Sequence, residues 1–259
     1  MKDLIIFTFL AVVSSTLLAQ TPEEMGLNIF QRIDEREKGY GDSIVDITMI
    51  LKNANNDMSI RVMEIKTLEQ PNDGDKSLTI IKSPKDVKGT ALLSYSHALS
   101  LDEQWLYLPA LKRIKRISSS NKSGSFLGSE YAYEDITTFQ IEKFEYLLIK
   151  EEIYDNKNCF VVELTPLFQY SGYSRLLVWV DASIYIILKT EYYDRKNELL
   201  KTQYLKDYQQ YYNKFWRSLD QLMINNVNEK STRLLFENYQ FQTGLTERNF
   251  DQNSLKRSR

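Results

Sequence analysis

The chain has 259 residues, of which 42% are hydrophobic, 26% charged and 12% aromatic. This composition is typical of a folded globular protein and excludes low-complexity disorder and collagen-like repeats. The 33 basic and 35 acidic residues give a net charge of −2, so electrostatics gives no reason to expect a nucleic-acid-binding protein. With 9 glycines but 17 tyrosines and 12 phenylalanines, the composition favours a β-rich chain over a glycine-dependent nucleotide-binding fold.

The first residues have the layout of a secretory signal peptide. Lys2 precedes the apolar run of residues 4–18, and a polar segment follows Gln20. The run is shorter than the roughly 20 apolar residues that a membrane-spanning helix needs. We therefore expect residues 1–19 to be a cleaved signal peptide and residues 20–259 to form a single exported domain.

The start of this expected domain has the pattern of an amphipathic helix. Residues 21–24, Thr-Pro-Glu-Glu, combine a threonine N-cap, a proline at the first helical position and a glutamate that can close a capping box. Met25, Ile29 and Ile33 then recur every four residues and form one apolar stripe. The helix should end at Gly39, because glycine commonly follows the last helical turn.

From residue 43 onward the hydrophobic period changes to two, which predicts β-strands. Short stretches rich in asparagine, aspartate and glycine separate several of them, and such short connections imply antiparallel hairpins. The expected strands cover residues 44–52, 58–68, 77–82, 90–96, 104–108, 113–118, 144–154, 159–166, 174–180, 184–193, 198–208, 215–224 and 230–241. We also expect a helical insertion near residues 130–139 and a short helix near residues 246–256.

Several central segments are apolar on both faces, which limits the architecture. Trp105 and Tyr107 point to one side of their strand, Leu106 and Leu108 point to the other, and residues 174–180 repeat the pattern. An antiparallel sheet of this kind must curl into a barrel or receive a cover on its concave side. We therefore predict a mainly β fold with helices (α+β): a curved antiparallel incomplete β-barrel with an N-terminal helix and a helical lid over the concave face. A β-sandwich has the same periodicity and stays open as an alternative.

The sequence lacks the residue patterns of common catalytic and metal sites. His97 and Cys159 are the only histidine and cysteine of the chain, so a zinc site of the usual composition cannot form. Residues 123–129 lack the lysine of a phosphate-binding loop, and neither a Gly-x-Ser-x-Gly sequence nor a dinucleotide-binding glycine pattern occurs. We predict no metal, no cofactor and no catalytic residue, and we interpret His97 as a turn residue and Cys159 as a buried small hydrophobe.

Residues 83–135 contain the most distinctive pattern of the chain. A basic cluster follows a predicted turn at Pro109 and consists of Lys112, Arg113, Lys115, Arg116 and Lys122. An acidic cluster comes next and consists of Glu130, Glu134 and Asp135. A solvated charged surface is the plain interpretation of both clusters, and the alternative is that Arg116 pairs with Glu134 or Asp135. Two glycines flank Phe126 and would let this loop turn sharply and push one aromatic ring inward.

Two stretches of this segment resemble a known family. Residues 105–117 (WLYLPALKRIKRI) and residues 123–130 (SGSFLGSE) are similar to the signature of the outer-membrane lipoprotein-sorting protein family, which is related to the periplasmic carriers LolA and LolB. The resemblance extends over roughly residues 22–255, and Glu130 stands where the family more often has aspartate. It implies a strongly curved, incomplete barrel with helices over an apolar cavity for acyl chains, in the periplasm of a Gram-negative cell. It carries over no catalytic residue.

On this basis we expect a periplasmic carrier that shields the acyl chains of a lipoprotein or other lipid and delivers them towards the outer membrane. The expected partners are these acyl chains, an inner-membrane transporter and an outer-membrane acceptor, with no nucleic acid. Two alternatives stay open. One is a non-enzymatic envelope accessory protein that partners a membrane transporter, and the other is a hydrolase with two carboxylates in a polar cleft.

The predicted binding residues follow from the expected facing of the strands. The cavity would be lined by Leu93, Tyr95, Trp105, Tyr107, Phe126, Leu177 and Trp179. A partner surface would use Lys112, Arg113, Lys115 and Arg116. Because successive residues of a strand point to opposite faces, an error of one residue would exchange the whole face of a strand.

Overall fold

The first helix has the predicted cap. The computed structural model describes residues 20–257, so the expected signal peptide at residues 1–19 lies outside the described residues. Helix α1 (Pro22–Glu37) begins after Thr21, whose hydroxyl accepts a hydrogen bond from the backbone of Glu24, while the Glu24 carboxylate accepts one from the backbone of Thr21. This reciprocal pair is the expected capping box. No helix within residues 20–257 is long and apolar enough to cross a membrane.

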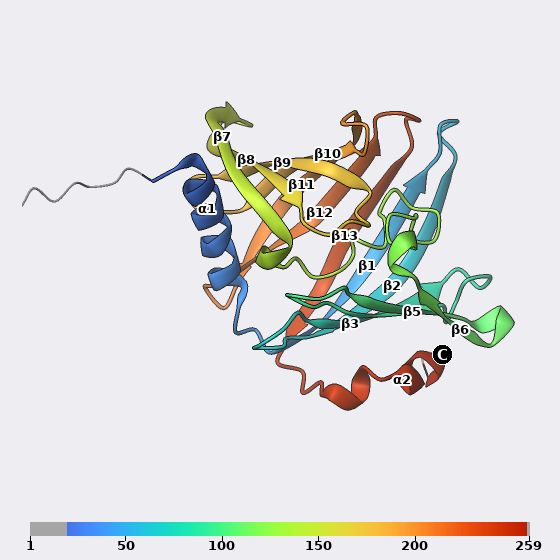
Figure 1. Ribbon diagram of the computed structural model, residues 1–259. Coiled ribbons are helices and arrows are strands. Elements are labelled where there is room, and N and C mark those ends of the chain that lie inside the picture. Colours follow the sequence, from blue (N-terminus) through green and yellow to red (C-terminus); the bar gives the residue numbers. More distant parts are fainter. Residues whose placement is uncertain (1–19, 258–259) are drawn as a thin grey trace, which may run out of the picture.

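One antiparallel sheet dominates the described chain (Figure 1). Its thirteen strands confirm the predicted ones, with ends that shift by at most a few residues. They are β1 (Asp42–Lys52), β2 (Met58–Leu68), β3 (Lys76–Ser83), β4 (Ala91–Tyr95), β5 (Glu103–Leu108), β6 (Arg113–Ile117), β7 (Phe144–Tyr154), β8 (Lys157–Pro166), β9 (Tyr173–Asp181), β10 (Ile187–Asp194), β11 (Leu199–Tyr211), β12 (Phe215–Asn225) and β13 (Ser231–Phe241).

The order of the strands shows that the barrel is incomplete. Along the sheet the strands run β6-β5-β4-β3-β2-β1-β13-β12-β11-β10-β9-β8-β7. Strand β1 pairs with both β2 and β13, so the first and last strands meet in the middle of the sheet. Strands β6 and β7 follow one another in the sequence yet form the two edges. The predicted curved, open barrel is therefore confirmed (Figure 1). The strands form one continuous sheet, so the alternative of a β-sandwich, which needs two sheets, is wrong.

Residues 118–143 connect the two edges, and we call them the crossing segment. Its Phe126 and Tyr131 are buried in the same core as Ile47 and Val178, from strands on both halves of the sheet. The crossing segment therefore covers the concave face. It contains two single-turn helices, η2 (Ser119–Asn121) and η3 (Ile141–Lys143).

The predicted helical insertion at residues 130–139 is wrong, because this stretch forms turns and bends. The acidic side chains explain the difference. The Asp135 carboxylate accepts a hydrogen bond from the backbone of Ala132 at 2.6 Å, and the Glu134 carboxylate accepts one from the backbone of Gly172 at 2.8 Å. Such side-chain bonds to the backbone compete with helix formation. The lid is thus a loop, assisted by the buried Phe30 of α1.

The outer face of the sheet has its own apolar cover, as the two-faced strands require. The chain after β13 forms η4 (Glu247–Asn249) and α2 (Gln252–Arg257), which confirms the predicted helical piece at residues 246–256. Phe250 and Leu255 from this piece are fully buried against Leu93 and Tyr107. In Figure 1, α2 lies beneath β3 and β5, on the side away from the crossing segment.

Helix α1 packs against the edge strand β7 through a glycine. A Cβ atom added at Gly26 would lie 3.0 Å from the backbone nitrogen of Leu148 and 3.1 Å from the carbonyl carbon of Leu147. Backbone atoms in a paired strand cannot move aside as a flexible side chain can. The absence of a side chain at Gly26 therefore sets how closely α1 approaches β7.

We predict that Gly26→Val lowers the free energy of unfolding by about 1–3 kcal/mol, the usual cost of overpacking a tight contact. Valine has a slightly better helix propensity than glycine, so the loss would come from the contact with β7. Urea unfolding followed by circular dichroism measures it. Gln31→Val, on the exposed side of the same helix, is the control and should change the free energy by only a few tenths of a kcal/mol. Equal effects of the two variants would contradict this account.

Candidate functional site

Two cavities lie between the crossing segment and the concave face of the sheet. The first has a volume of about 220 Å³ and lies towards α1 and β7; we call it the α1-side cavity. The second has a volume of about 230 Å³ and lies over β1 and β2; we call it the β1-side cavity. Apolar side chains of the first include Phe30, Phe139, Phe144, Leu164, Leu176, Val178, Ile187 and Leu205. Those of the second include Ile47, Met49, Met63, Ile65, Phe126, Leu234 and Phe236.

A short part of the crossing segment separates the two cavities. Asp135, Thr137 and Thr138 line both of them, as does Gln203 of β11. We call residues 135–138 the wall. Each cavity is smaller than the roughly 300–1,000 Å³ of typical ligand pockets, whereas the two together reach that range. A displacement of the wall would therefore turn two small voids into one ligand-sized chamber.

A buried ion pair holds the wall against the sheet. Lys201 of β11 donates to the Asp135 carboxylate at 2.5 Å, and each side chain is only 4% exposed. The same ammonium group donates to the backbone carbonyl of Glu130 at 2.9 Å, and the Tyr173 hydroxyl donates to Asp135 at 2.7 Å. Removing one partner of such a buried pair leaves a charge without compensation, which costs far more than losing a surface pair.

Glu134, next to the wall, is anchored in a similar way. Its carboxylate accepts hydrogen bonds from the Ser171 hydroxyl at 2.9 Å and from the Gly172 backbone at 2.8 Å. Burial raises the pKa of Glu134 above its ordinary value. The predicted pairing of Arg116 with Glu134 or Asp135 is wrong, since Arg116 binds Glu103 at 2.6 Å. It lies opposite Trp105 in the β5–β6 register and points to the outer face.

Lys122 is also not part of an exposed basic cluster. It is 3% exposed and donates to the backbone carbonyl of Asp102 at 2.6 Å, and Lys143 forms an ion pair with the Asp102 carboxylate. Burial lowers the pKa of Lys122. All three side chains line the α1-side cavity and also an outer pocket of about 260 Å³, whose rim includes the exposed Leu99 and Leu167. These three side chains therefore lie between the α1-side cavity and the outer pocket.

Comparisons with known proteins place the chain in a family. A family model described as "-like: Uncharacterized protein" matches residues 73–257. The chain is 50% identical to a domain from Vibrio parahaemolyticus assigned as an outer membrane lipoprotein-sorting protein, over 90% of this chain and 99% of that one, with a TM-score of 0.89. The chain belongs to the outer membrane lipoprotein-sorting protein family. No curated protein matches it.

Two further structures share the lipoprotein-sorting fold. A DUF1329 family protein from Desulfovibrio piger is 26% identical, covers 91% of this chain and 100% of its own, and has a TM-score of 0.86. A LolA superfamily protein from Nitrosomonas europaea is 20% identical over 91% and 100% of the two chains, with a TM-score of 0.72. The resemblance to LolA and LolB carriers that the sequence motifs indicate is thereby confirmed at the level of the fold.

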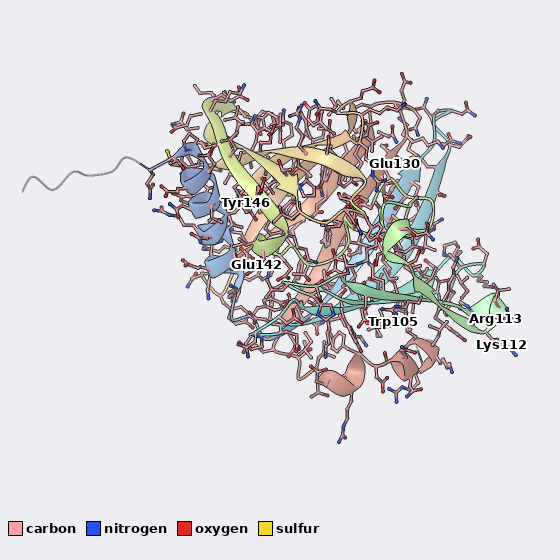
Figure 2. The ribbon with its side chains drawn as sticks, in the orientation of Figure 1. Trp105, Lys112, Arg113, Glu130, Glu142 and Tyr146 are labelled. Carbon is pink, nitrogen blue, oxygen red and sulfur yellow. The ribbon has the colours of Figure 1, made fainter. Side chains whose placement is uncertain are left out.

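Of the residues predicted to line the cavity of this family member, only Phe126 does so. Leu93, Tyr95, Trp105 and Tyr107 form an apolar cluster with Phe250 and Leu255 on the outer face. Figure 2 shows Trp105 on the side of the sheet towards α2. Leu177 and Trp179 pack in another outer cluster, with Cys159 and Ile186. The predicted facing of these six residues is therefore wrong by one position.

The residues on the concave face are their neighbours in sequence, among which Leu176 and Val178 line the α1-side cavity. Leu92, Leu106, Leu176 and Val178 belong to the inner core with Phe126. Alternation alone could not select the inner face, because apolar side chains also cover the outer face, from the C-terminal helical piece at β4 and β5 and from a separate cluster at β9. The sequence interpretation also missed Lys201. Lys201 stands two and four residues before Gln203 and Leu205, which line the α1-side cavity, and a lysine on that face would have been a signal once the facing was known.

The predicted partner residues lie together on the β5–β6 hairpin. Lys112 follows η1 (Pro109–Leu111), while Arg113, Lys115 and Arg116 belong to the edge strand β6. All four are exposed. Their role in binding a partner stays a prediction.

The residues considered for catalysis lie away from the two cavities. His97 bonds Asp73 at 2.6 Å and lies 3.9 Å from Glu103, and it lines neither cavity. Cys159 is buried, and burial raises the pKa of its thiol. Within residues 20–257 no group of three or more histidine, cysteine, aspartate or glutamate side chains could hold a metal ion.

We predict that Lys201→Met lowers the free energy of unfolding by about 3–5 kcal/mol, because Asp135 would stay buried without its cation. Hydrogen exchange should also become faster in residues 130–138, where the lost contacts lie. The control is Lys38→Met, which removes an ion pair with Asp34 whose lysine is 65% exposed and should cost at most about 1 kcal/mol. Similar costs for the two variants would show that the buried pair does not hold the wall.

Proposed function

We propose that this protein is a carrier of the bacterial periplasm that shields acyl chains of a lipoprotein or another lipid on their way to the outer membrane. Family membership supports the sorting role, since the 50% identical domain from Vibrio parahaemolyticus is assigned to it. The fold supports a non-enzymatic carrier, because the LolA superfamily protein has the same half-barrel. The acyl chains would be held on the concave face.

The observation that carries the proposal is the pair of apolar cavities divided by a loop. Each methylene group kept from water contributes roughly 0.8 kcal/mol, so an apolar chamber of ligand size can hold a hydrocarbon chain. The wall belongs to no strand of the sheet. It can therefore move outward without the loss of a single inter-strand hydrogen bond, and the sheet can stay intact as the chamber forms.

The mechanism that follows is a competition between cargo and the crossing segment. In the closed form, Phe126 and Ile136 line the β1-side cavity themselves. An acyl chain would replace these contacts and separate Asp135 from Lys201. A ligand shifts such an equilibrium only by its differential affinity for the two forms. Loading and release would thus need partners that favour the open form, for which we propose an inner-membrane transporter and an outer-membrane acceptor.

Uptake of a fatty acid tests this proposal. We expect delipidated protein to bind cis-parinaric acid with a rise in fluorescence and with no hydrolysis. Val178→Phe, which fills the α1-side cavity, should weaken binding by about tenfold, a loss of about 1.4 kcal/mol. Leu177→Phe is the matched control. Leu177 is adjacent to Val178 but points to the outer face, so this variant should leave the affinity unchanged.

Two results would contradict the carrier. The first is the absence of uptake by folded wild-type protein, which is what a solidly packed envelope accessory protein predicts. The second is an equal effect of Val178→Phe and Leu177→Phe, which would place binding elsewhere. Native mass spectrometry of protein purified from its own periplasm would identify the cargo directly, since a bound lipid adds its mass.

A further inference from the structure

The β5–β6 hairpin lies in a long stretch of the sequence that contains no acidic residue. Between Glu103 and Glu130 the only charged residues are Lys112, Arg113, Lys115, Arg116 and Lys122. The whole chain, in contrast, has slightly more acidic than basic residues. This stretch therefore concentrates positive charge locally in a protein with almost no net charge.

The structure places most of this charge at one exposed tip. Lys112, Arg113 and Lys115 are exposed, and within residues 20–257 none of them forms an ion pair. Arg116 is held by Glu103 and Lys122 is buried. Figure 2 shows Lys112 and Arg113 at the far end of the hairpin, projecting away from the body of the protein.

An apolar side chain stands at the same tip. Leu111, directly before Lys112, is 62% exposed. The loop between β3 and β4 ends at the same end of the sheet, because Ala91 pairs with Tyr107. This loop adds the exposed Lys85 and Lys88, with Asp86 as its acidic residue.

Protection of an edge strand explains only part of this pattern. Edge strands commonly carry lysine and arginine, which oppose pairing with another chain, and Arg113 and Lys115 fit that role. Lys85 and Lys88 lie on a loop, so they do not protect an edge strand. An exposed leucine at the tip would work against protection. Exposed cations and an exposed apolar side chain at one end of the sheet are instead typical of a surface that meets anionic lipid headgroups.

We propose that the tip of the β5–β6 hairpin, residues 111–115 together with Lys85 and Lys88, docks on a bilayer surface that contains anionic phospholipids. The cations would lie among the headgroups and Leu111 would enter the boundary with the acyl chains. The crossing segment begins at the other end of β6, after Ile117, because Arg113 at the tip pairs with Leu108 whereas Ile117 pairs with Gln104. This proposal rests on the charge and exposure of the hairpin and does not require that the chamber binds lipid.

Vesicle flotation with the full exported chain tests the docking surface. We expect binding to vesicles of phosphatidylcholine mixed with phosphatidylglycerol, and little binding to phosphatidylcholine alone. Binding to the mixed vesicles should fall in 1 M salt, where the screening length is about 3 Å. The triple variant Lys112→Glu, Arg113→Glu and Lys115→Glu should reduce the vesicle-bound fraction at least about tenfold. Leu111→Asn should reduce it several-fold with no change in charge.

The matched control reverses three exposed lysines elsewhere, as Lys196→Glu, Lys206→Glu and Lys230→Glu, and has the same change of net charge. It should keep the binding of the wild type. Equal binding to both kinds of vesicle, or an equal loss in the two triple variants, would overturn the proposal. So would a tip variant that binds vesicles normally but loses an acidic protein partner. Should the triple variant fail to fold, the lipid and salt dependence of the wild type and the Leu111→Asn variant still decide the question, and the fatty-acid assay remains separate.

Discussion

Strands β6 and β7 are consecutive in the sequence and yet form opposite edges of one open sheet, and most of the structure depends on this constraint. The crossing segment has to pass from one edge to the other, and it crosses the concave face mostly as turns and bends. Buried peptide groups need hydrogen-bond partners, and Lys201, Gln104 and Arg61 donate to carbonyls of this segment. A loop fixed at separate points leaves space on both sides of the wall.

One of these fixed points is the buried ion pair between Lys201 and Asp135. Well-packed apolar residues often stabilise a fold as much as a buried pair does, so Asp135 and Lys201 are no obvious route to greater stability. Their bond differs in that it has a defined geometry and leaves two charges that water readily solvates once they part. The ion pair is thus one defined anchor of the wall, beside the bonds of Glu134 to Ser171 and Gly172.

The sequence was sufficient for the elements and insufficient for their facing. Turn residues and the period of two predicted all thirteen strands, and the local pattern Thr-Pro-Glu-Glu predicted the start of α1. The facing failed where both sides of a strand are apolar, because a pattern of period two then fits either register. The prediction of a helix at residues 130–139 was wrong because Glu134 bonds to Gly172 and Asp135 bonds to Lys201. Contacts across such sequence distances leave no local signature.

The meeting of β1 and β13 in the middle of the sheet has a consequence for how the molecule is made. Most neighbouring strands are joined by short turns and can pair as soon as they emerge, since local contacts form early. Between the two halves of the sheet, however, the strand pairing is that of β1 with β13, near the two ends of the described chain. A nascent or shortened chain that lacks β13 would therefore leave β1 without this partner and the two half-sheets unpaired, so the concave interior would have no continuous wall.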